Sequence, residues 1–167
     1  QKAIQINPNH PRVYYNLGLA FKEMGEYQKA ISYYEKAIKI KPDYFIAYNN
    51  LGIVFYELRE FQKAISCHEQ TIQINPNFVN GHFGLGNVLE ELSENEKAKS
   101  CYERAIQINP NFANGHFGLG NVFEELGEYQ KAIGCYKKAI QIQPNHVDAY
   151  NNLALAFKGQ GEYQKAI

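Results

Sequence analysis

Residues 13–42 read VYYNLGLAFKEMGEYQKAISYYEKAIKIKP, and near-copies of this stretch follow along the chain. The prolines that close the copies recur at a constant step of 34 residues: Pro8, Pro42, Pro76, Pro110 and Pro144. A fixed period between about 20 and 50 residues indicates stacked structural repeats. We therefore predict a single repeat array over residues 1–167. Residues 1–10 are the end of a second helix. The complete repeats are 11–44, 45–78, 79–112 and 113–146, and residues 147–167 form a partial repeat.

Each repeat carries apolar residues at helical spacing. In residues 45–58 they are Ala47, Tyr48, Leu51, Val54, Phe55 and Leu58, which fall on one helical stripe. Residues 61–74 show the same spacing, and a proline follows, which stops a helix because it lacks the N–H and clashes with the preceding turn. Small residues such as Gly52 and Ala64 let the two helices approach closely. Each repeat should be an antiparallel helix pair, which gives an all-α fold.

The repeat resembles the tetratricopeptide repeat (TPR), whose pattern is aromatic-x2-Leu-Gly-x2-aromatic, then Ala-x3-aromatic, then Pro. The first copy supplies every element of this pattern: Tyr14, Leu17, Gly18, Phe21, Ala30, Tyr34 and Pro42. Later copies depart at single places: His68, His82, Leu89, His116 and Ala154. The resemblance implies a right-handed superhelical solenoid that serves as a protein-protein interaction scaffold. Because both ends cut through a repeat, we expect a fragment of a longer TPR array.

The charge balance bears on the class of partner. Lys plus Arg number 17 and Asp plus Glu number 17, so there is no net charge. Proteins that bind nucleic acid generally carry a basic footprint, so we expect no nucleic-acid partner. No apolar run approaches the roughly 20 residues that cross a bilayer, and no signal segment is visible. We expect a cytoplasmic location without membrane insertion.

Residues that often carry chemistry have structural explanations here. Cys67, Cys101 and Cys135 lie 34 residues apart, on successive second helices that a first helix separates, so disulfides between them are not expected. His82 and His116 occupy an aromatic core place of the repeat rather than a metal site. The sequence contains no pair of cysteines at the spacing of a zinc site and no phosphate-binding loop. We expect no enzymatic activity, no cofactor and no metal.

The TPR resemblance also implies where a ligand binds. In this family the first helices line a concave groove, with contacts from repeat positions 2, 5, 9, 12 and 13, counted from residues 11, 45, 79, 113 and 147. These positions and the adjacent position 6 give the predicted contacts: Tyr15, Asn16, Asn49, Asn50, Tyr56, Asn80, Phe83, Asn87, Glu91, Asn114, Phe117, Asn121, Glu125, Asn151 and Asn152.

Position 6 suggests two features of this groove. Asn16, Asn50 and Asn152 form a column of amides, which can pair with a peptide backbone because an amide both donates and accepts. The alternative is that Asn is simply common there in the family. Gly84 and Gly118 replace the amide in the next two repeats. Their missing side chains could open apolar pockets on the groove floor, or the glycines could reflect a recent duplication.

An acidic row follows the same helices at position 13: Glu23, Glu57, Glu91 and Glu125. Glu90 and Glu124 reinforce it at position 12. A basic or amphipathic peptide would suit such a row. A solvated helix face is the alternative explanation.

The expected function is a scaffold that holds a peptide or partner domain in its concave groove. Two alternatives remain open from the sequence. Uncapped repeat ends could stack head to tail into a self-assembling array. The repeats could also be the substrate-recruiting arm of a larger enzyme. The chaperone-tail receptors among TPR proteins are disfavoured because their position-5 lysine is absent.

Overall fold

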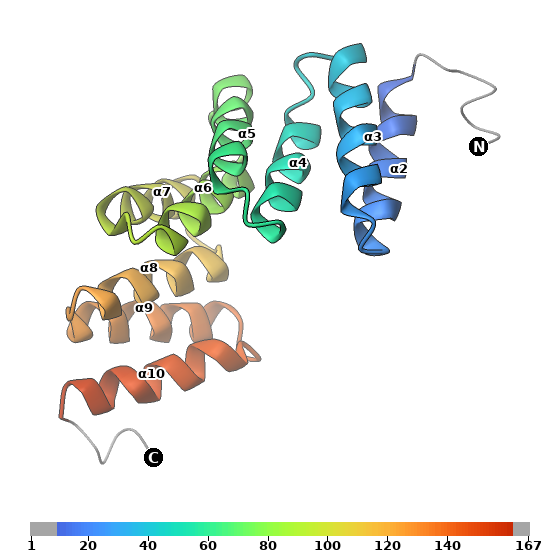
Figure 1. Ribbon diagram of the computed structural model, residues 1–167. Helices are drawn as coiled ribbons and strands as arrows, with labels where there is room; N and C mark the ends of the chain where they lie inside the picture. The colour runs from blue at the N-terminus through green and yellow to red at the C-terminus, as the bar shows by residue number, and fades with distance from the viewer. Residues whose placement is uncertain (1–9, 162–167) are drawn as a thin grey trace. The chain divides into compact units, whose positions relative to one another are not determined.

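The computed structural model describes residues 10–161, which form α-helices joined by short turns and contain no strand (Figure 1). The first helices are α2 (Pro11–Glu23), α4 (Phe45–Glu57), α6 (Val79–Glu91), α8 (Ala113–Glu125) and α10 (Val147–Gly159). The second helices are α3 (Tyr27–Ile40), α5 (Phe61–Ile74), α7 (Asn95–Ile108) and α9 (Tyr129–Ile142). The predicted all-α repeat of helix pairs is confirmed. The helices predicted over residues 1–9 and 162–167 lie outside the described residues.

The chain forms two compact units, residues 1–84 and residues 85–167, and the division falls inside α6. In the first unit α2 packs on α3, α3 on α4 and α4 on α5. In the second unit α7 packs on α8, α8 on α9 and α9 on α10. Thus α4 lies between α3 and α5 in the first unit, and α8 lies between α7 and α9 in the second. This arrangement places the predicted contact positions of successive first helices next to one another within a unit.

An aromatic ring at repeat position 24 forms the centre of each helix pair. Tyr34, Tyr102 and Tyr136 are fully buried, and His68 is 1% exposed. A Cβ on Gly18 would lie 2.6 Å from the Tyr34 ring, so the position-8 glycine is required by the closeness of the ring. The sequence-based explanation of these glycines, close approach of the two helices, is confirmed.

The turn within each helix pair is a Schellman motif. In the last complete repeat the N–H of Gly127 donates to the carbonyl of Glu124, and that of Glu128 donates to the carbonyl of Phe123 over 2.8 Å. The motif needs one left-handed residue, and Gly127 adopts φ 72°. Arg59 and Ser93 occupy the same place with φ of 58° and 57°. Both therefore adopt the strained conformation instead of another turn.

Exchanging the turn residues should measure this strain. A left-handed conformation costs a residue with a Cβ roughly 1–2 kcal/mol, and glycine's greater freedom in the unfolded chain offsets part of the gain. Ser93→Gly should therefore raise the free energy of unfolding by about 0.5–1 kcal/mol, and Gly127→Ser should lower it by a similar amount. Urea denaturation followed by circular dichroism checks both variants. If both variants unfolded with the same free energy as the original chain, the left-handed turn residue would carry no strain.

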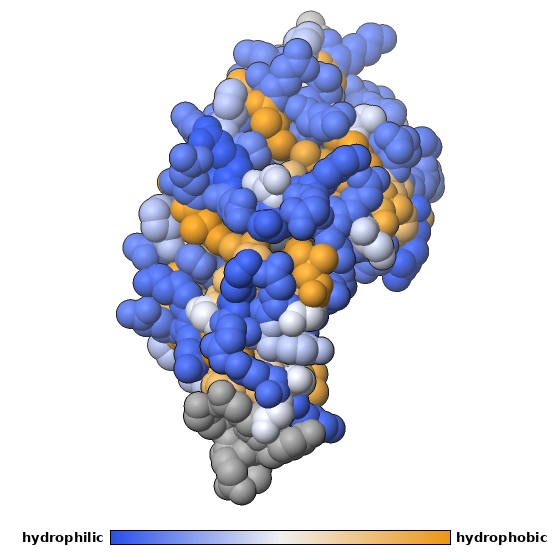
Figure 2. Space-filling view, turned by 90° about the vertical axis from the view of Figure 1, so that its left-hand side faces the viewer, coloured by the Kyte–Doolittle hydropathy of each residue, from blue (hydrophilic) through white to orange (hydrophobic). Residues whose placement is uncertain are grey.

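The surface shows where the apolar residues remain accessible. On the face drawn in Figure 2, hydrophobic residues form narrow strips between larger hydrophilic areas. Within the described range no helix combines the length and the apolar character that crossing a membrane requires.

Cys67, Cys101 and Cys135 are free thiols, as expected. Burial raises the pKa of Cys67 to about 12 and those of Cys101 and Cys135 to about 11.

Candidate functional site

The predicted contact residues differ in exposure. Those open to solvent are Asn16, Asn80, Glu91, Asn114, Glu125 and Asn151. Those that are half-buried are Tyr15, Tyr56, Phe83, Asn87, Phe117, Asn121 and Asn152. Asn49 and Asn50 are buried, at 5% and 9% exposure. A ligand could reach the first two groups directly but not the third.

In the first unit Asn50 serves the fold itself. Its Nδ2 donates to the carbonyl of Ile46 over 2.9 Å and lies 3.3 Å from the hydroxyl of Tyr15 in the preceding repeat. Tyr15 in turn packs against Tyr34 and Tyr44, with ring centroids 6.0 and 5.4 Å away. The amide predicted to pair with a peptide backbone is thus occupied internally. We leave Asn50 out of the proposed contact surface.

In the second unit polar side chains of α6 and α7 meet at a tyrosine hydroxyl. The hydroxyl of the buried Tyr102 lies 2.9 Å from Asn87 Oδ1 and also contacts the carboxylate of Glu90. The arrangement repeats one repeat later, between α8 and α9. There the hydroxyl of Tyr136 lies 3.0 Å from Asn121 Oδ1 and 2.6 Å from Glu124 Oε2.

Hydrogen bonds between first helices join these two clusters. Asn121 Nδ2 donates to Glu90 Oε1 over 3.2 Å, which links α8 to α6. Asn152 Nδ2 on α10 donates to Asn121 Oδ1 over 3.0 Å. We call the connected side chains the polar ladder: Asn87, Glu90, Tyr102, Asn121, Glu124, Tyr136 and Asn152. The ladder fixes the orientation of groups along the first helices.

Sequence reasoning found the Asn and Glu members of the ladder but not its tyrosines. Tyr102 and Tyr136 stand at the aromatic place of the repeat pattern, and their hydroxyls connect the ladder. The signal is the combination of Asn at position 9, Glu at position 12 and Tyr at position 24. The first repeat has Leu19 and Lys22 at the first two of these positions, and there the buried hydroxyl of Tyr34 has no hydrogen-bond partner.

Burial governs the electrostatics of the ladder. It raises the pKa of Glu90, and the nearby carboxylates of Glu125 and Glu91 raise it further. Hydrogen bonds from Tyr102 and Asn121 oppose this rise. A half-buried carboxylate next to other carboxylates is short of positive charge, so a cation that reached it would interact favourably.

The expectation of pockets beside Gly84 and Gly118 is wrong. A Cβ on Gly84 would lie 2.4 Å from His68 Cε1, and one on Gly118 would lie 2.7 Å from Tyr102 Cζ. The ring of the preceding repeat therefore fills the space that each missing side chain leaves. These glycines serve close packing between repeats, and no apolar hole opens there.

Phe117 is held in place on α8 by two rings. Its ring lies 5.9 Å from that of Tyr136 and 4.8 Å from that of His146, between centroids. His146 is itself fixed, because its Nδ1 accepts the N–H of Ala149 at the start of α10. Phe117 remains half-buried. It is therefore an ordered aromatic surface beside the ladder.

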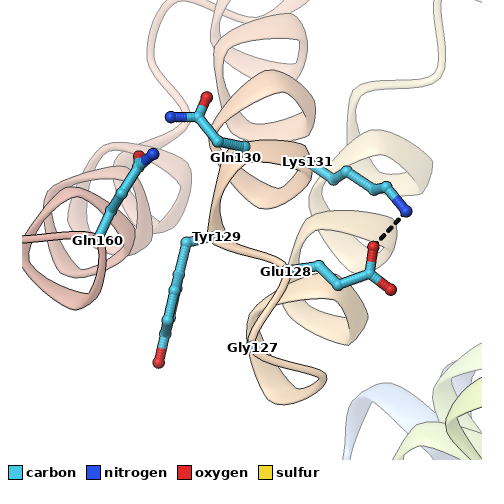
Figure 3. A pocket seen from close by; sticks show the side chains of 6 residues that line it. All are labelled: Gly127, Glu128, Tyr129, Gln130, Lys131 and Gln160. Atoms are coloured by element: carbon cyan, nitrogen blue, oxygen red, sulfur yellow. Dashed lines mark ion pairs between the residues drawn. The ribbon is translucent and has the colours of Figure 1, made fainter.

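A separate pocket of about 380 Å³ lies at the start of α9, near the end of α10 (Figure 3). It is lined by Gly127, Glu128, Tyr129, Gln130, Lys131 and Gln160. Lys131 and Glu128 form an ion pair with each other across part of its wall (Figure 3). The charged groups of this pocket are thus already paired, and the pocket shares no residue with the ladder.

The two histidines at the aromatic core place bind backbone. His82 Nε2 lies 2.9 Å from the carbonyl of Pro76, and His116 Nε2 lies 3.0 Å from that of Pro110. Each ties a first helix to the loop before it. Among residues 10–161 no three His, Cys, Asp or Glu side chains are grouped so that they could hold a metal ion.

The sequence matches the models of a known repeat family. Residues 11–44 and 45–78 match the tetratricopeptide repeat, and residues 91–127 and 121–161 match the TPR repeat. The chain belongs to the tetratricopeptide repeat family. No curated protein sequence matches this TPR chain significantly.

Solved structures of similar proteins share the TPR fold. The MamA protein is 27% identical with a TM-score of 0.81, over 93% of this chain and 85% of MamA. YrrB, described as a TPR protein with an unusual peptide-binding site, is 23% identical with a TM-score of 0.78, over 99% of this chain and 86% of YrrB. PilF of Pseudomonas aeruginosa is 22% identical with a TM-score of 0.86, over 93% of this chain and 71% of PilF.

Proposed function

We propose that this TPR chain is a protein-interaction scaffold and that its second unit binds an extended stretch of another polypeptide. The contact surface is the α8 face, defined by repeat positions 2, 5, 9, 12 and 13: Asn114, Phe117, Asn121, Glu124 and Glu125. The neighbouring ladder residues of α6 and α10 extend it. The observation that carries the proposal is the ladder, which holds polar side chains in place next to the ordered ring of Phe117.

Preorganisation makes this surface suitable for binding. Ordering a flexible side chain on binding costs roughly 0.5–1.5 kcal/mol, and the ladder has ordered its side chains before a ligand arrives. Aromatic residues contribute disproportionately to binding energy at interfaces, and Phe117 is placed to do so. The description of YrrB as a peptide-binding TPR protein supports the same use of the fold.

In the first unit the corresponding positions are more apolar. Tyr15, Tyr56 and Phe83 are half-buried there, and so are Ile46 and Ile53. This surface would add aromatic contacts to a partner without the fixed polar groups of the ladder. We therefore place the specific part of recognition on the second unit.

The test is selection from a phage-displayed library of random peptides on the immobilised chain. Selected peptides are then synthesised and their affinities measured by fluorescence polarisation. The Phe117→Ala variant should weaken binding by tenfold or more, because it removes the aromatic anchor of the α8 face. Asn114→Arg should also weaken binding, since it places a bulky group on the exposed part of the same face without removing a core contact.

Tyr150→Ala is the matched control. Tyr150 is 49% exposed and lies at position 4, about 100° around its helix from the contact position 5. Its loss should leave affinity unchanged. Circular dichroism confirms that each variant is folded. If no peptide is selected, or if Asn114→Arg binds the selected peptides as tightly as the original chain does, the proposed function is wrong.

A further inference from the structure

The last repeat departs from the others at two adjacent places near the end of α10. At repeat position 14 the other repeats carry an apolar side chain: Met24, Leu58, Leu92 and Leu126. The last repeat carries Gln160 there. At position 13 the other repeats carry a glutamate, and the last repeat carries Gly159. Both departures lie beside the start of α9, where the pocket of about 380 Å³ is found.

Gly159 makes room for an aromatic wall of this pocket. A Cβ on Gly159 would lie 2.6 Å from Cε1 of Tyr129, so the ring lies against bare backbone at the end of α10. A glutamate at this place, as in the other repeats, would displace the ring. Tyr129 lines the pocket together with Gln130 from the same helix and Gln160 from α10 (Figure 3).

Gln160 places a polar atom without a partner in the same pocket. Its Oε1 is buried and has no hydrogen-bond partner among residues 10–161. Its backbone is fixed at the end of α10, where its N–H donates to the carbonyl of Ala156 over 3.0 Å. A buried acceptor without a donor costs free energy, which a leucine at this place would avoid. The pocket therefore contains a fixed acceptor that lacks a donor.

A second amide faces this acceptor from the other helix. The side chains of Gln130 on α9 and Gln160 on α10 point toward one another (Figure 3). Gln130 is exposed and has not closed onto Gln160, whose Oε1 stays unpaired within the described part of the chain. An amide side chain can both donate and accept. A planar group with one donor and one acceptor would therefore suit the two walls.

The charges around the pocket favour a neutral ligand. Glu128 and Lys131 form an ion pair with each other, so neither sign is in excess. Lys131 also lies over the ring of Phe123, 5.3 Å from its centroid, which holds it further. A volume of about 380 Å³ lies near the lower end of the roughly 300–1,000 Å³ that small-molecule pockets occupy. The occupant should be small and uncharged.

We propose that this pocket binds a neutral primary carboxamide attached to an apolar or aromatic group. The carboxamide N–H donates to Gln160 Oε1, its carbonyl accepts from the amide of Gln130, and the attached group lies against the ring of Tyr129. The carboxamide belongs either to a free small molecule or to a glutamine side chain of another polypeptide. The pocket shares no residue with the α8 face, so this inference does not depend on the proposed function.

The experiment titrates the ¹⁵N-labelled full chain with probes of one shape and follows its amide signals by NMR. Benzamide donates and accepts, benzoate only accepts, and the benzamidine cation only donates. Benzamide should shift the signals of residues 127–131 and Gln160 until saturation, with at least tenfold higher affinity than the other two. A dissociation constant on the order of 1 mM is expected for so small a ligand.

A fourth probe distinguishes the two sources of the carboxamide. N-acetylglutamine methylamide carries the group on a glutamine side chain. If it shifts the same signals with higher affinity than benzamide, the site takes a glutamine of another polypeptide. If benzamide binds more tightly, the site takes a free small molecule.

Two Gln→Leu variants test the assigned residues. Gln160→Leu gives the last repeat the residue that its neighbours carry, so it should fold and should bind benzamide at least tenfold more weakly. Gln141→Leu makes the same change at an exposed residue near the other end of α9 and should leave affinity unchanged. Circular dichroism confirms that both variants are folded.

A third variant tests the choice of ligand rather than its affinity alone. Gln160→Glu keeps the shape of the side chain and replaces the amide with a carboxylate, which only accepts hydrogen bonds and carries a negative charge. The preference of the pocket should therefore move from benzamide to benzamidine. A role of Gln160 in folding alone would not produce this exchange.

Three outcomes would overturn the inference. If neither carboxamide shifts the signals of residues 127–131 to saturation, water satisfies Gln160 and the pocket is no carboxamide site. If benzoate binds as tightly as benzamide, the start of α9 attracts anions instead. If Gln160→Leu binds benzamide as tightly as the original chain does, the probe binds elsewhere. None of these results changes the outcome of the peptide selection described above.

Discussion

Replacing Tyr102 with alanine should lower the free energy of unfolding by about 4–5 kcal/mol, the upper end of the range for removal of a buried aromatic side chain. The size follows from the neighbours of the ring. A Cβ on Gly86 or Gly118 would lie 2.6 or 2.7 Å from the ring, so bare helix backbone lies against it from two successive first helices. Neither glycine has a side chain that could move into the cavity, which would therefore stay open.

Two further variants divide this loss into its parts. Tyr102→Phe keeps the ring and removes only the hydroxyl, so it should cost about 1–2 kcal/mol from the acceptors left without a donor. Tyr102→Leu fills part of the cavity, so its loss in free energy of unfolding should lie between those of the other two variants. Urea denaturation followed by circular dichroism provides the values. If alanine cost no more than phenylalanine, the ring would not be the element that holds these repeats together.

Acid should destabilise the first unit through His68. The ring is 1% exposed, its Nδ1 has no hydrogen-bond partner, and burial lowers its pKa to about 4. In the unfolded chain histidine titrates near pH 6.5. Between these two values the unfolded chain takes up a proton that the folded chain does not, so stability falls as pH falls from about 6.5 to about 4. The loss over this window is about 3 kcal/mol.

The comparison with His68→Phe isolates this effect from the titration of carboxylates. Both proteins contain the same acidic residues, so their stability difference should depend on pH through His68 alone. The original chain should lose about 3 kcal/mol relative to the variant between neutral pH and pH 4, with little further relative loss below. A difference that stays constant with pH would mean that His68 has the same pKa in the folded and the unfolded chain, as a ring accessible to water would.

The sequence predicted helix boundaries closely because its punctuation is local. Proline follows each second helix, and Gly-Glu or its substitutes mark each hairpin turn, so neither boundary depends on distant contacts. At Arg59 and Ser93 the sequence left two outcomes open. The residue could adopt the strained left-handed conformation, or the chain could form a different turn. The structure resolves this in favour of strain at both places.

Interactions between repeats could not be predicted in the same way. Gly118 looked like a gap because a single repeat contains nothing to fill it, whereas the filling ring, Tyr102, belongs to the repeat before. Asn50 looked like a ligand contact, although its bond to Tyr15 also crosses between repeats. The ladder depends on the register of neighbouring first helices, which the period of the sequence does not specify.

The three free thiols have a practical consequence for spectroscopy on this protein. Thiolates are the species that react with maleimides, and burial keeps Cys67, Cys101 and Cys135 protonated at neutral pH. A cysteine introduced at an exposed site would therefore be labelled well before the native ones. A fluorophore or spin label could thus be attached at a chosen helix without first removing any cysteine from the chain.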